Sequence, residues 1–294
     1  AGFVQRGYKI GGFQAVSNST VLKGSGISSS AAFEVLIGTI LSHLYNDGQV
    51  PAQEIAKIGQ YAENVYFGKP CGLMDQMACS VGSLIHIDFA DPENPIVEQL
   101  KFDLNTYGYS LCITDTKGTH TDLTPDYAAI PQEMKKAAEC FGKNFLGEVS
   151  KEEIINNITR IRDCAGDRAA LRALHFVCEN ERVKEEVDAL KKNNFPQFLT
   201  KVKESGDSSF KYLQNVYTCH DVQHQNVSIA LALSDVIFGK KGVFRVHGGG
   251  FAGTIQAFVP NYLVSNYQKE MDKIFGNGSC EVLKIRKYGG IKVL

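Results

Sequence analysis

The order of helix-like and strand-like segments is the feature that most restricts what this chain can fold into. Strand-like segments lie toward both ends, at Gly12–Ser17, Ser83–Asp88, Tyr109–Thr114 and Val243–Val259, the last interrupted by a glycine-rich loop. Between them, Tyr127–Ser234 follows a helical pattern almost throughout. Strands at both ends with a helical region between them predict an α+β fold.

Apolar spacing and end signals predict several individual helices. Helices are expected over Ala31–Tyr45 and Ala52–Phe67, followed by a short helix within Pro70–Gln76. Ser150 and Glu153 have the spacing of a capping box, so a helix should begin after Ser150.

Charge and hydropathy exclude two classes of partner. The chain has 31 Lys and Arg against 32 Asp and Glu, a formal net charge of −1, which gives no general attraction for nucleic acid or for an anionic membrane. The longest apolar run, Val35–Leu41, is far shorter than the ~20 residues that cross a bilayer. We therefore expect neither a nucleic-acid nor a membrane partner.

The eight cysteines indicate a compartment. None forms a CxxC pair, and most lie among apolar residues. This pattern predicts reduced, buried thiols in a cytoplasmic protein rather than a disulfide framework.

A glycine- and serine-rich stretch, Gly24–Ser30, directly precedes the first long helix. Glycines permit close backbone approach, and the first amides of a helix lack intrahelical partners and carry partial positive charge. The stretch therefore predicts an anion site, in which one serine caps the helix and another coordinates a phosphate-bound Mg²⁺. It lacks the lysine of a Walker A loop and the third glycine of a dinucleotide fingerprint. An ordinary capped helix after a flexible turn is the alternative.

Three motifs, in order, resemble the galactokinase branch of the GHMP small-molecule kinases: Gly24–Ala32 (GSGISSSAA), Gly68–Gln76 (GKPCGLMDQ) with Glu63 before it, and Arg245–Gly253 (RVHGGGFAG). The resemblance covers nearly the whole chain. It implies a two-lobe fold, with an incomplete ribosomal S5 domain 2-like N-terminal lobe over residues 1–117. A ferredoxin-like helical C-terminal lobe is expected over residues 118–294.

The resemblance also implies roles for individual residues. Asp75 would be the catalytic base beside the sugar C1 hydroxyl, Gly72 and Tyr127 would contact the sugar with it, and Ser30 with Glu63 would hold Mg²⁺. The ATP phosphates would be bound by Gly24, Ser25, Gly26, Ile27, Ser28, Ser29 and Ser30. A second loop, supporting the phosphate loop, would be formed by Gly248, Gly249, Gly250 and Gly253.

Each role has a structural alternative. Asp75 could be a helix-terminal carboxylate and Glu63 a solvated helix residue. Tyr127 could be a core aromatic whose hydroxyl bonds the backbone, and Gly248–Gly250 could form a bare turn or bulge.

Some family features differ or are absent. The arginine-bearing segment with the Glu, His and Asp that grip the sugar does not occur, and the chain begins at Ala1. Thr119 stands where the family has arginine, and His247 lies in the Arg245 motif where threonine is usual. We therefore expect an N-terminally truncated chain that is catalytically silent alone.

The resulting expectation is an ATP- and Mg²⁺-dependent kinase acting on the anomeric hydroxyl of galactose or a related sugar. Two alternatives remain: a non-catalytic sugar- and ATP-binding regulator, and another GHMP kinase acting on an isoprenoid or amino-acid alcohol. The sequence leaves the exact sugar and the oligomeric state open.

Overall fold

The computed structural model describes residues 1–21, 27–68, 71–118 and 123–293. Its elements are helical and strand-rich in the mixture expected of an α+β protein, which confirms that fold class. The chain divides into two compact units. The first unit comprises Ala1–Phe102 and Ile285–Leu294, and the second comprises Asp103–Lys284.

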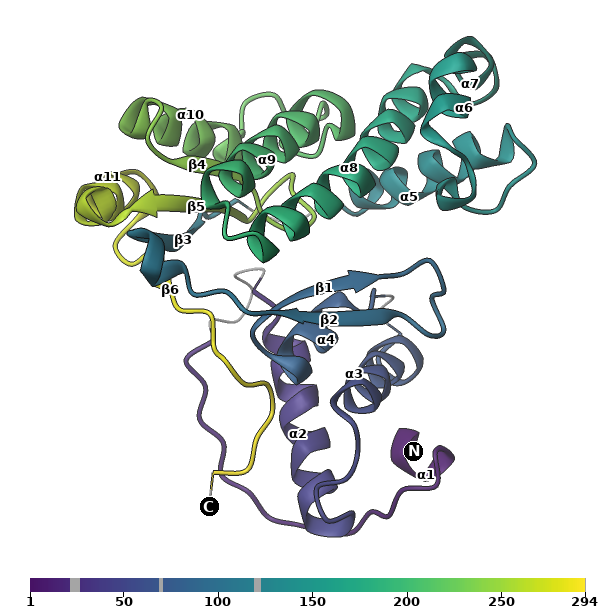
Figure 1. The fold of residues 1–294 in the computed structure, drawn as a ribbon, viewed down its shortest axis with the longest axis vertical. Helices are drawn as coiled ribbons and strands as arrows, with labels where there is room; N and C mark the ends of the chain where they lie inside the picture. Colours follow the sequence, from purple (N-terminus) through teal and green to yellow (C-terminus); the bar gives the residue numbers. More distant parts are fainter. Residues whose placement is uncertain (22–26, 69–70, 119–122, 294) are drawn as a thin grey trace. The chain divides into compact units, whose positions relative to one another are not determined.

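The first unit is built from helices and one hairpin (Figure 1). Strands β1 and β2 pair antiparallel, with Leu84 opposite Leu100, and α3 packs against both α2 and α4. The helix predicted over 31–45 is confirmed, and so is the one over 52–67, which continues from an α-helix into a π-helix. The elements are α1 (Gly2–Gln5), α2 (Ser29–Tyr45), α3 (Ala52–Tyr61), η1 (Ala62–Tyr66), α4 (Met74–Val81), β1 (Leu84–Asp88) and β2 (Ile96–Leu100).

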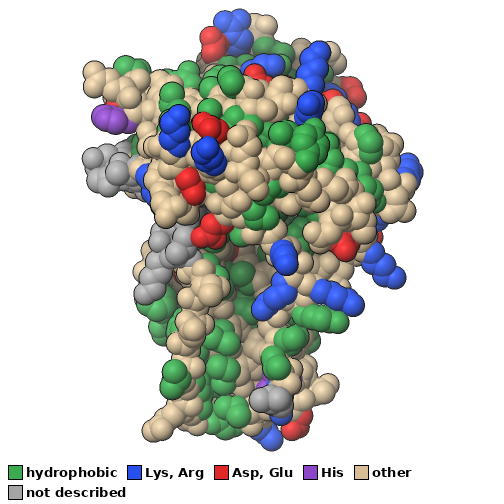
Figure 2. All heavy atoms as spheres, turned by 90° about the vertical axis from the view of Figure 1, so that its left-hand side faces the viewer, with side chains coloured by type: hydrophobic (Ala, Val, Ile, Leu, Met, Phe, Trp, Pro, Cys, Tyr) green, Lys and Arg blue, Asp and Glu red, His purple; other side chains and the backbone are tan. Residues whose placement is uncertain are grey.

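Helix α2 buries the small side chains of one face and exposes bulky ones on another. Ala31, Val35 and Gly38 are buried, whereas Phe33 and Leu44 are each 57% exposed. Green hydrophobic side chains also reach the surface on the face drawn in Figure 2. Some bulky apolar side chains of this unit therefore remain exposed to solvent.

The strand predicted at Gly12–Ser17 is wrong. These residues carry no regular secondary structure, and Val16 is fully exposed. A strand is stable only when it pairs with another, and no described strand pairs with this segment.

The C-terminal segment packs closely on the end of α4. The amide of Ser83 donates to the Arg286 carbonyl at 2.7 Å. A Cβ on Gly82 would lie 2.2 Å from the Tyr288 carbonyl carbon, and one on Gly289 would lie 1.8 Å from the Ser80 carbonyl oxygen. Only glycine permits this backbone-to-backbone contact.

The second unit contains a four-stranded antiparallel sheet in the order β4-β5-β3-β6. Cys112 of the central strand β3 lies opposite Ala257 of β5 and Val282 of β6. The strands are β3 (Tyr109–Asp115), β4 (Val243–Val246), β5 (Thr254–Pro260) and β6 (Cys280–Leu283).

Helices pack on this sheet and extend beyond it (Figure 1). Helices α9 and α10 contact β4, and α11 contacts β3, β5 and β6. The apolar core between sheet and helices includes Val227, Ile255, Tyr267 and Met271, all fully buried. The capping box at Ser150 is confirmed. The helices are α5 (Thr124–Glu139), α6 (Lys151–Asn156), α7 (Ile158–Ala165), α8 (Asp167–Lys191), α9 (Phe195–Ser208), α10 (Asn226–Phe238) and α11 (Val264–Phe275), with shorter turns η2 (Leu104–Tyr107), η3 (Leu146–Glu148), η4 (Ser209–Leu213) and η5 (Asn261–Leu263).

The compact units do not divide at residues 117 and 118, where the sequence predicted the domain boundary. The difference has a structural cause, because β3 pairs with β5 and β6 and so belongs to the second unit. The segment after Lys284 rejoins the first unit. No described helix is long and apolar enough to cross a membrane.

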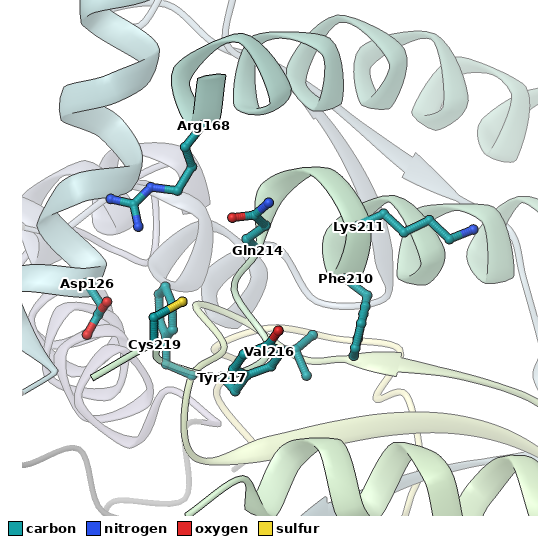
Figure 3. Close-up of a pocket in the computed structure, with 9 residues that line it drawn as sticks. Asp126, Arg168, Phe210, Lys211, Gln214, Val216, Tyr217 and Cys219 are labelled. Carbon is teal, nitrogen blue, oxygen red and sulfur yellow. The ribbon is translucent and has the colours of Figure 1, made fainter. Parts of the chain in front are cut away.

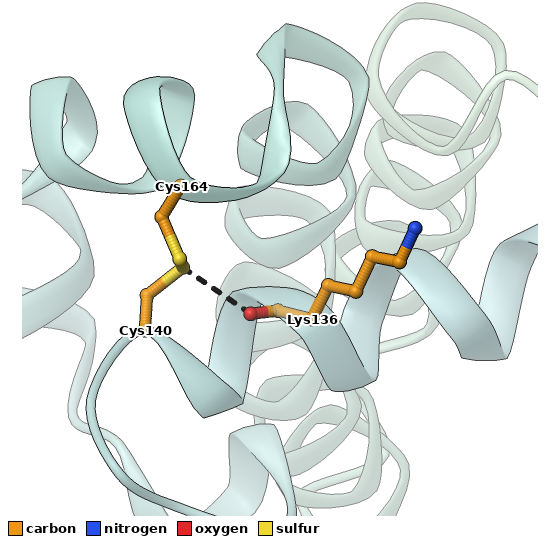
Figure 4. Close-up of a disulfide and its surroundings, with 3 residues drawn as sticks. All are labelled: Lys136, Cys140 and Cys164. Carbon is orange, nitrogen blue, oxygen red and sulfur yellow. Dashed lines mark hydrogen bonds between the residues drawn. A yellow bond between two sulfur atoms is a disulfide. The ribbon is translucent and has the colours of Figure 1, made fainter.

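The expectation of wholly reduced cysteines is wrong, because Cys140 and Cys164 form a disulfide (Figure 4). Cys140 ends α5 and Cys164 lies in α7, and packing of these helices brings their Cα atoms to 6.2 Å. That separation is in the normal range for a disulfide. Cys140 Sγ also lies 3.2 Å from the Lys136 carbonyl oxygen. The remaining six cysteines are free.

Candidate functional site

The predicted phosphate-binding residues lie at the start of α2. Gly24, Ser25 and Gly26 are outside the described residues. Ile27, Ser28 and Ser29 are half-buried and Ser30 is exposed, with Ser28 in the N-cap position at φ 62° and ψ 43°. The left-handed backbone of Ser28 is uncommon for a residue other than glycine, and such conformations concentrate at functional sites.

The N-terminus of α2 has the features of an anion site. The Ser28 side chain makes no capping hydrogen bond, so the expectation that a serine caps this helix is not met at the N-cap, and no acidic residue lies in the first turn. The first amides of a helix have no intrahelical partners, and the helix dipole makes this end positive. An anion could take the place of the missing cap.

A buried polar cluster joins α2, η1 and α4. The Gln76 side-chain nitrogen donates to Glu63 Oε2 at 3.0 Å and to Glu34 Oε2 at 3.1 Å. Glu63 is only 5% exposed and Gln76 only 1%. Glu63 is therefore not the solvated helix residue that the alternative interpretation required.

Two adjacent polar residues of helix α4, Asp75 and Gln76, differ in their exposure to solvent. Asp75 is exposed in the first turn, while Gln76 points into the cluster. Gly72, just before the helix, is exposed, and a Cβ there would meet nothing within 4 Å. The Asp75 carboxylate is thus open to a ligand and lies at the positive end of the helix dipole.

The residues of this cluster fit Mg²⁺ in kind. Magnesium takes oxygen ligands, and in kinase sites it binds one or two carboxylates together with substrate phosphates. Glu63 supplies a carboxylate, and Gln76 Oε1 is a buried oxygen with no hydrogen-bond partner. Among the described residues no group of three or more His, Cys, Asp and Glu could enclose a metal ion, so a fully protein-made cage is absent from this part of the chain.

Cys71 borders the cluster but does not suit a metal ligand. Burial, then its hydrogen bond with Glu63, raises the pKa of the Cys71 thiol to about 11. The thiol stays protonated at neutral pH, whereas a metal ligand must be a thiolate.

In the second unit, Tyr127 joins the glycine loop. Its hydroxyl donates to the Gly250 carbonyl at 2.7 Å, and its ring makes an edge contact with Phe251 at 5.2 Å between centroids. Burial raises the pKa of the Tyr127 phenol, so it stays protonated. This is the backbone-bonded arrangement of the structural alternative.

Close contacts within the second unit require glycine at several positions of this loop. Gly248, Gly250 and Gly253 have φ values of 64°, 82° and 99°. A Cβ on Gly250 would lie 1.8 Å from the Asn215 carbonyl oxygen, and one on Gly249 would lie 2.8 Å from Tyr127 Cε1. The loop is therefore more than a bare turn, and its support of the phosphate loop stays a prediction.

A cavity of about 320 Å³ lies next to these residues in the second unit (Figure 3). Asp126 in this cavity accepts a hydrogen bond from the Thr218 hydroxyl at 2.9 Å, and Arg168 is ion-paired with Glu133. None of the predicted site residues lines it. The lining comprises Asp126, Arg168, Phe210, Lys211, Gln214, Val216, Tyr217, Cys219 and Phe251.

The described site residues thus form two groups, one in each unit. Ser30, Glu63, Gly72 and Asp75 lie in the first unit, and Tyr127 lies with the glycine loop in the second. Gln76 stands in the same motif as Asp75, but the sequence does not single it out. Glu34 is marked in the sequence only as a single carboxylate early in an apolar helix.

Residues 1–83 match the model of the GHMP kinases N-terminal domain. Over 271 residues the chain is 33% identical to a galactokinase of Glaesserella parasuis, a match that covers 89% of this chain and 67% of that protein. A galactokinase of Clostridium tetani is 30% identical over 281 residues, covering 93% and 68%. The chain thus spans about two thirds of the length of these curated relatives.

Solved structures agree on the fold. The structure of Lactococcus lactis galactokinase complexed with galactose matches with a TM-score of 0.74 at 23% identity, covering 98% of this chain and 73% of that one. The structure of L. major mevalonate kinase in complex with R-mevalonate matches with a TM-score of 0.57 at 14% identity, covering 91% and 68%.

Proposed function

The chain belongs to the galactokinase family of GHMP kinases, and on this premise we propose that it serves to transfer the γ-phosphoryl group of ATP to the C1 hydroxyl of galactose or a closely related sugar. One observation carries the proposal. An exposed carboxylate, Asp75, lies in the first turn of α4, and the next residue, Gln76, is buried and bonded to the carboxylate of Glu63. An open carboxylate beside a shielded one suits the two tasks of phosphoryl transfer, orienting a hydroxyl and holding a metal ion.

The nucleotide phosphates would bind at the N-terminus of α2. The uncapped amides after Ser28 and the absence of acidic residues in the first turn favour a polyanion there. Ser30 and Glu63 would hold Mg²⁺, which when bound neutralises charge on the β- and γ-phosphate oxygens.

Asp75 would act on the sugar. A carboxylate oxygen of Asp75 would accept a hydrogen bond from the C1 hydroxyl, orient it toward the γ-phosphorus and take its proton as the new P–O bond forms. Gly72, with open space beside it, would let the sugar approach.

The test is a coupled ADP-release assay on the purified protein. Galactose should stimulate ADP release in the presence of Mg²⁺, and Asp75→Asn should lower kcat by about 10²–10⁴-fold while leaving ATP affinity within about twofold. Asp188→Asn, at an exposed carboxylate of α8, is the matched control. Equal losses of kcat and ATP affinity in Asp75→Asn would instead indicate a structural role.

The same assay separates this proposal from a non-catalytic sugar- and ATP-binding regulator. Binding of both ligands without ADP release would favour the regulator. The departure at His247 gives that alternative little support, because the His247 ring, directly after β4, bonds Gln256 of β5 at 3.0 Å. N-acetylgalactosamine, arabinose and mevalonate as acceptors would define the substrate. A cytoplasmic location is also proposed on the basis of the six free thiols, and the Cys140–Cys164 disulfide is the observation against it.

A further inference from the structure

We propose that Gln76 is a positioning residue of the phosphoryl-transfer site, whose side-chain amide bridges Glu34 and Glu63 and thereby holds the Glu63 carboxylate fixed for Mg²⁺. The inference rests on the function proposed above and assigns new roles to Gln76 and Glu34. Gln76 would act through Glu63 and touch neither substrate.

The bridge uses both donors of one amide group. A glutamine NH₂ carries two N–H bonds, and those of Gln76 reach Glu63 Oε2 at 3.0 Å and Glu34 Oε2 at 3.1 Å. The three residues come from α4, η1 and α2, so one side chain ties together three helices. Hydrogen bonds to carboxylates are stronger than neutral ones, which suits a fixing role.

Burial makes the bond from Gln76 to Glu63 important. Gln76 is 1% exposed and Glu63 5% exposed, so water does not readily replace this hydrogen bond. A buried carboxylate is costly unless it is hydrogen-bonded. The amide of Gln76 therefore helps to hold the Glu63 carboxylate in one orientation, as residues that orient metal ligands do.

The packing fixes the amide in this orientation. A Cβ on Gly59 of α3 would lie 3.1 Å from Glu34 Oε2 and 3.3 Å from Gln76 Cγ, so the α3 backbone presses on the pair. Gln76 Oε1 has no hydrogen-bond partner. A buried oxygen without a hydrogen bond lowers the stability of the fold. Turning the amide over would place this oxygen, rather than the two N–H donors, against the carboxylates, so the observed orientation of the Gln76 amide is favoured.

The position on the helix links the bridge to the chemistry. Gln76 directly follows Asp75, and successive helical residues point about 100° apart. Fixing the Gln76 side chain between two carboxylates therefore also fixes the turn of α4 that carries Asp75.

The test measures how ATP affinity depends on Mg²⁺, by calorimetry on this chain. Gln76→Met keeps the length of the side chain and removes both donors. We expect its half-maximal Mg²⁺ concentration to rise by about 10–100-fold, as for other residues that orient metal ligands, with ATP affinity in the absence of Mg²⁺ within about twofold of wild type.

Gln60→Met is the matched control. Gln60 donates to the Cys71 carbonyl at 3.2 Å and touches neither carboxylate, so its loss should leave the Mg²⁺ dependence within about twofold of wild type. An unchanged Mg²⁺ midpoint in Gln76→Met, or an equal rise in Gln60→Met, would overturn the inference. Wild-type ATP binding that does not depend on Mg²⁺ would instead overturn the proposed metal site itself.

Glu34→Gln separates the bond to Glu63 from the rest of the bridge. Its amide oxygen can still accept the hydrogen bond of Gln76, so Glu63 should stay fixed and the Mg²⁺ midpoint should lie within about threefold of wild type. A midpoint about 10-fold or more above wild type in Glu34→Gln would show that any change in the cluster impairs the site, and would overturn the inference.

Discussion

The two units of this protein bury different kinds of side chain. The second unit packs a four-stranded sheet and its helices around fully buried apolar side chains such as Ile255, Tyr267 and Met271. The first unit, among its described residues, has one two-stranded sheet, small apolar clusters and exposed bulky side chains on α2. At its centre it buries a glutamine and a glutamate.

This difference indicates a division of labour. Apolar burial stabilises a fold in proportion to the area removed from water, whereas buried charges lower stability unless they are paired. We infer that the second unit provides most of the stability, and that the first unit is less stable because it buries charged groups. Units with few buried apolar contacts also open more easily, as ligand-binding segments commonly do.

The largest expected effect tests the packing of the second unit at its glycine loop. Gly250→Ala places a Cβ 1.8 Å from the Asn215 carbonyl oxygen at a φ of 82°, so it should lower the free energy of unfolding by about 3–5 kcal/mol, as other severe steric conflicts do. Gly248→Ala is the control, since its φ of 64° is also positive but nothing lies within 4 Å. It should cost only about 1 kcal/mol. Similar losses in chemical denaturation would contradict the account.

A smaller effect should follow in the first unit. Gly289→Ala places a Cβ 1.8 Å from the Ser80 carbonyl oxygen, so the C-terminal segment must move away from α4. We expect a loss of about 2–3 kcal/mol confined to the first unit, because a segment near a chain end can detach. Hydrogen exchange should quicken in α4 and leave β3 and β5 unchanged. Faster exchange in both units would argue against separate stabilities.

The smallest effect is a pH dependence in the second unit. Burial, and then repulsion from Glu179, raises the pKa of Glu186 to about 7. The folded state therefore retains this proton from the ordinary pKa of 4.5 up to about 7, and the stability it contributes is lost as the pH rises through that window. Glu186→Gln has no such loss. Its stability relative to wild type should rise by about 1–2 kcal/mol between pH 4.5 and 8.

Glu185→Gln provides the control for this prediction. A hydrogen bond with Lys201 lowers the pKa of Glu185, so its removal should produce no rise over the same interval. A pH-independent difference between wild type and Glu186→Gln would show that Glu186 is not buried as a neutral acid.

Local patterns allowed most helices to be predicted, because helical hydrogen bonds and caps depend on residues close in sequence. The helix at 31–45 and the capping box of Ser150 with Glu153 are examples. The strand predicted at Gly12–Ser17 failed because a strand depends on a partner that its own residues do not specify.

Tertiary packing explains what the sequence could not reveal about the site. The disulfide joins cysteines 24 residues apart through the contact of α5 with α7. In the same way, Glu34 and Gln76 are 42 residues apart and meet only because α2 and α4 pack together. The sequence motif identifies Asp75, whereas the hydrogen bonds of its neighbour Gln76 become visible only in the structure.

Hydrogen exchange with and without Mg²⁺ and ATP tests the central claim most directly, namely that the first unit holds the nucleotide site and the second unit stabilises the fold. With ligand at about 100 times its Kd, exchange should slow by up to about 100-fold at the start of α2 and in η1, and remain unchanged in β3 and β5. Unchanged exchange at Ser29–Tyr45 and Ala62–Tyr66, or protection confined to residues 209–219 beside the cavity of the second unit, would contradict it.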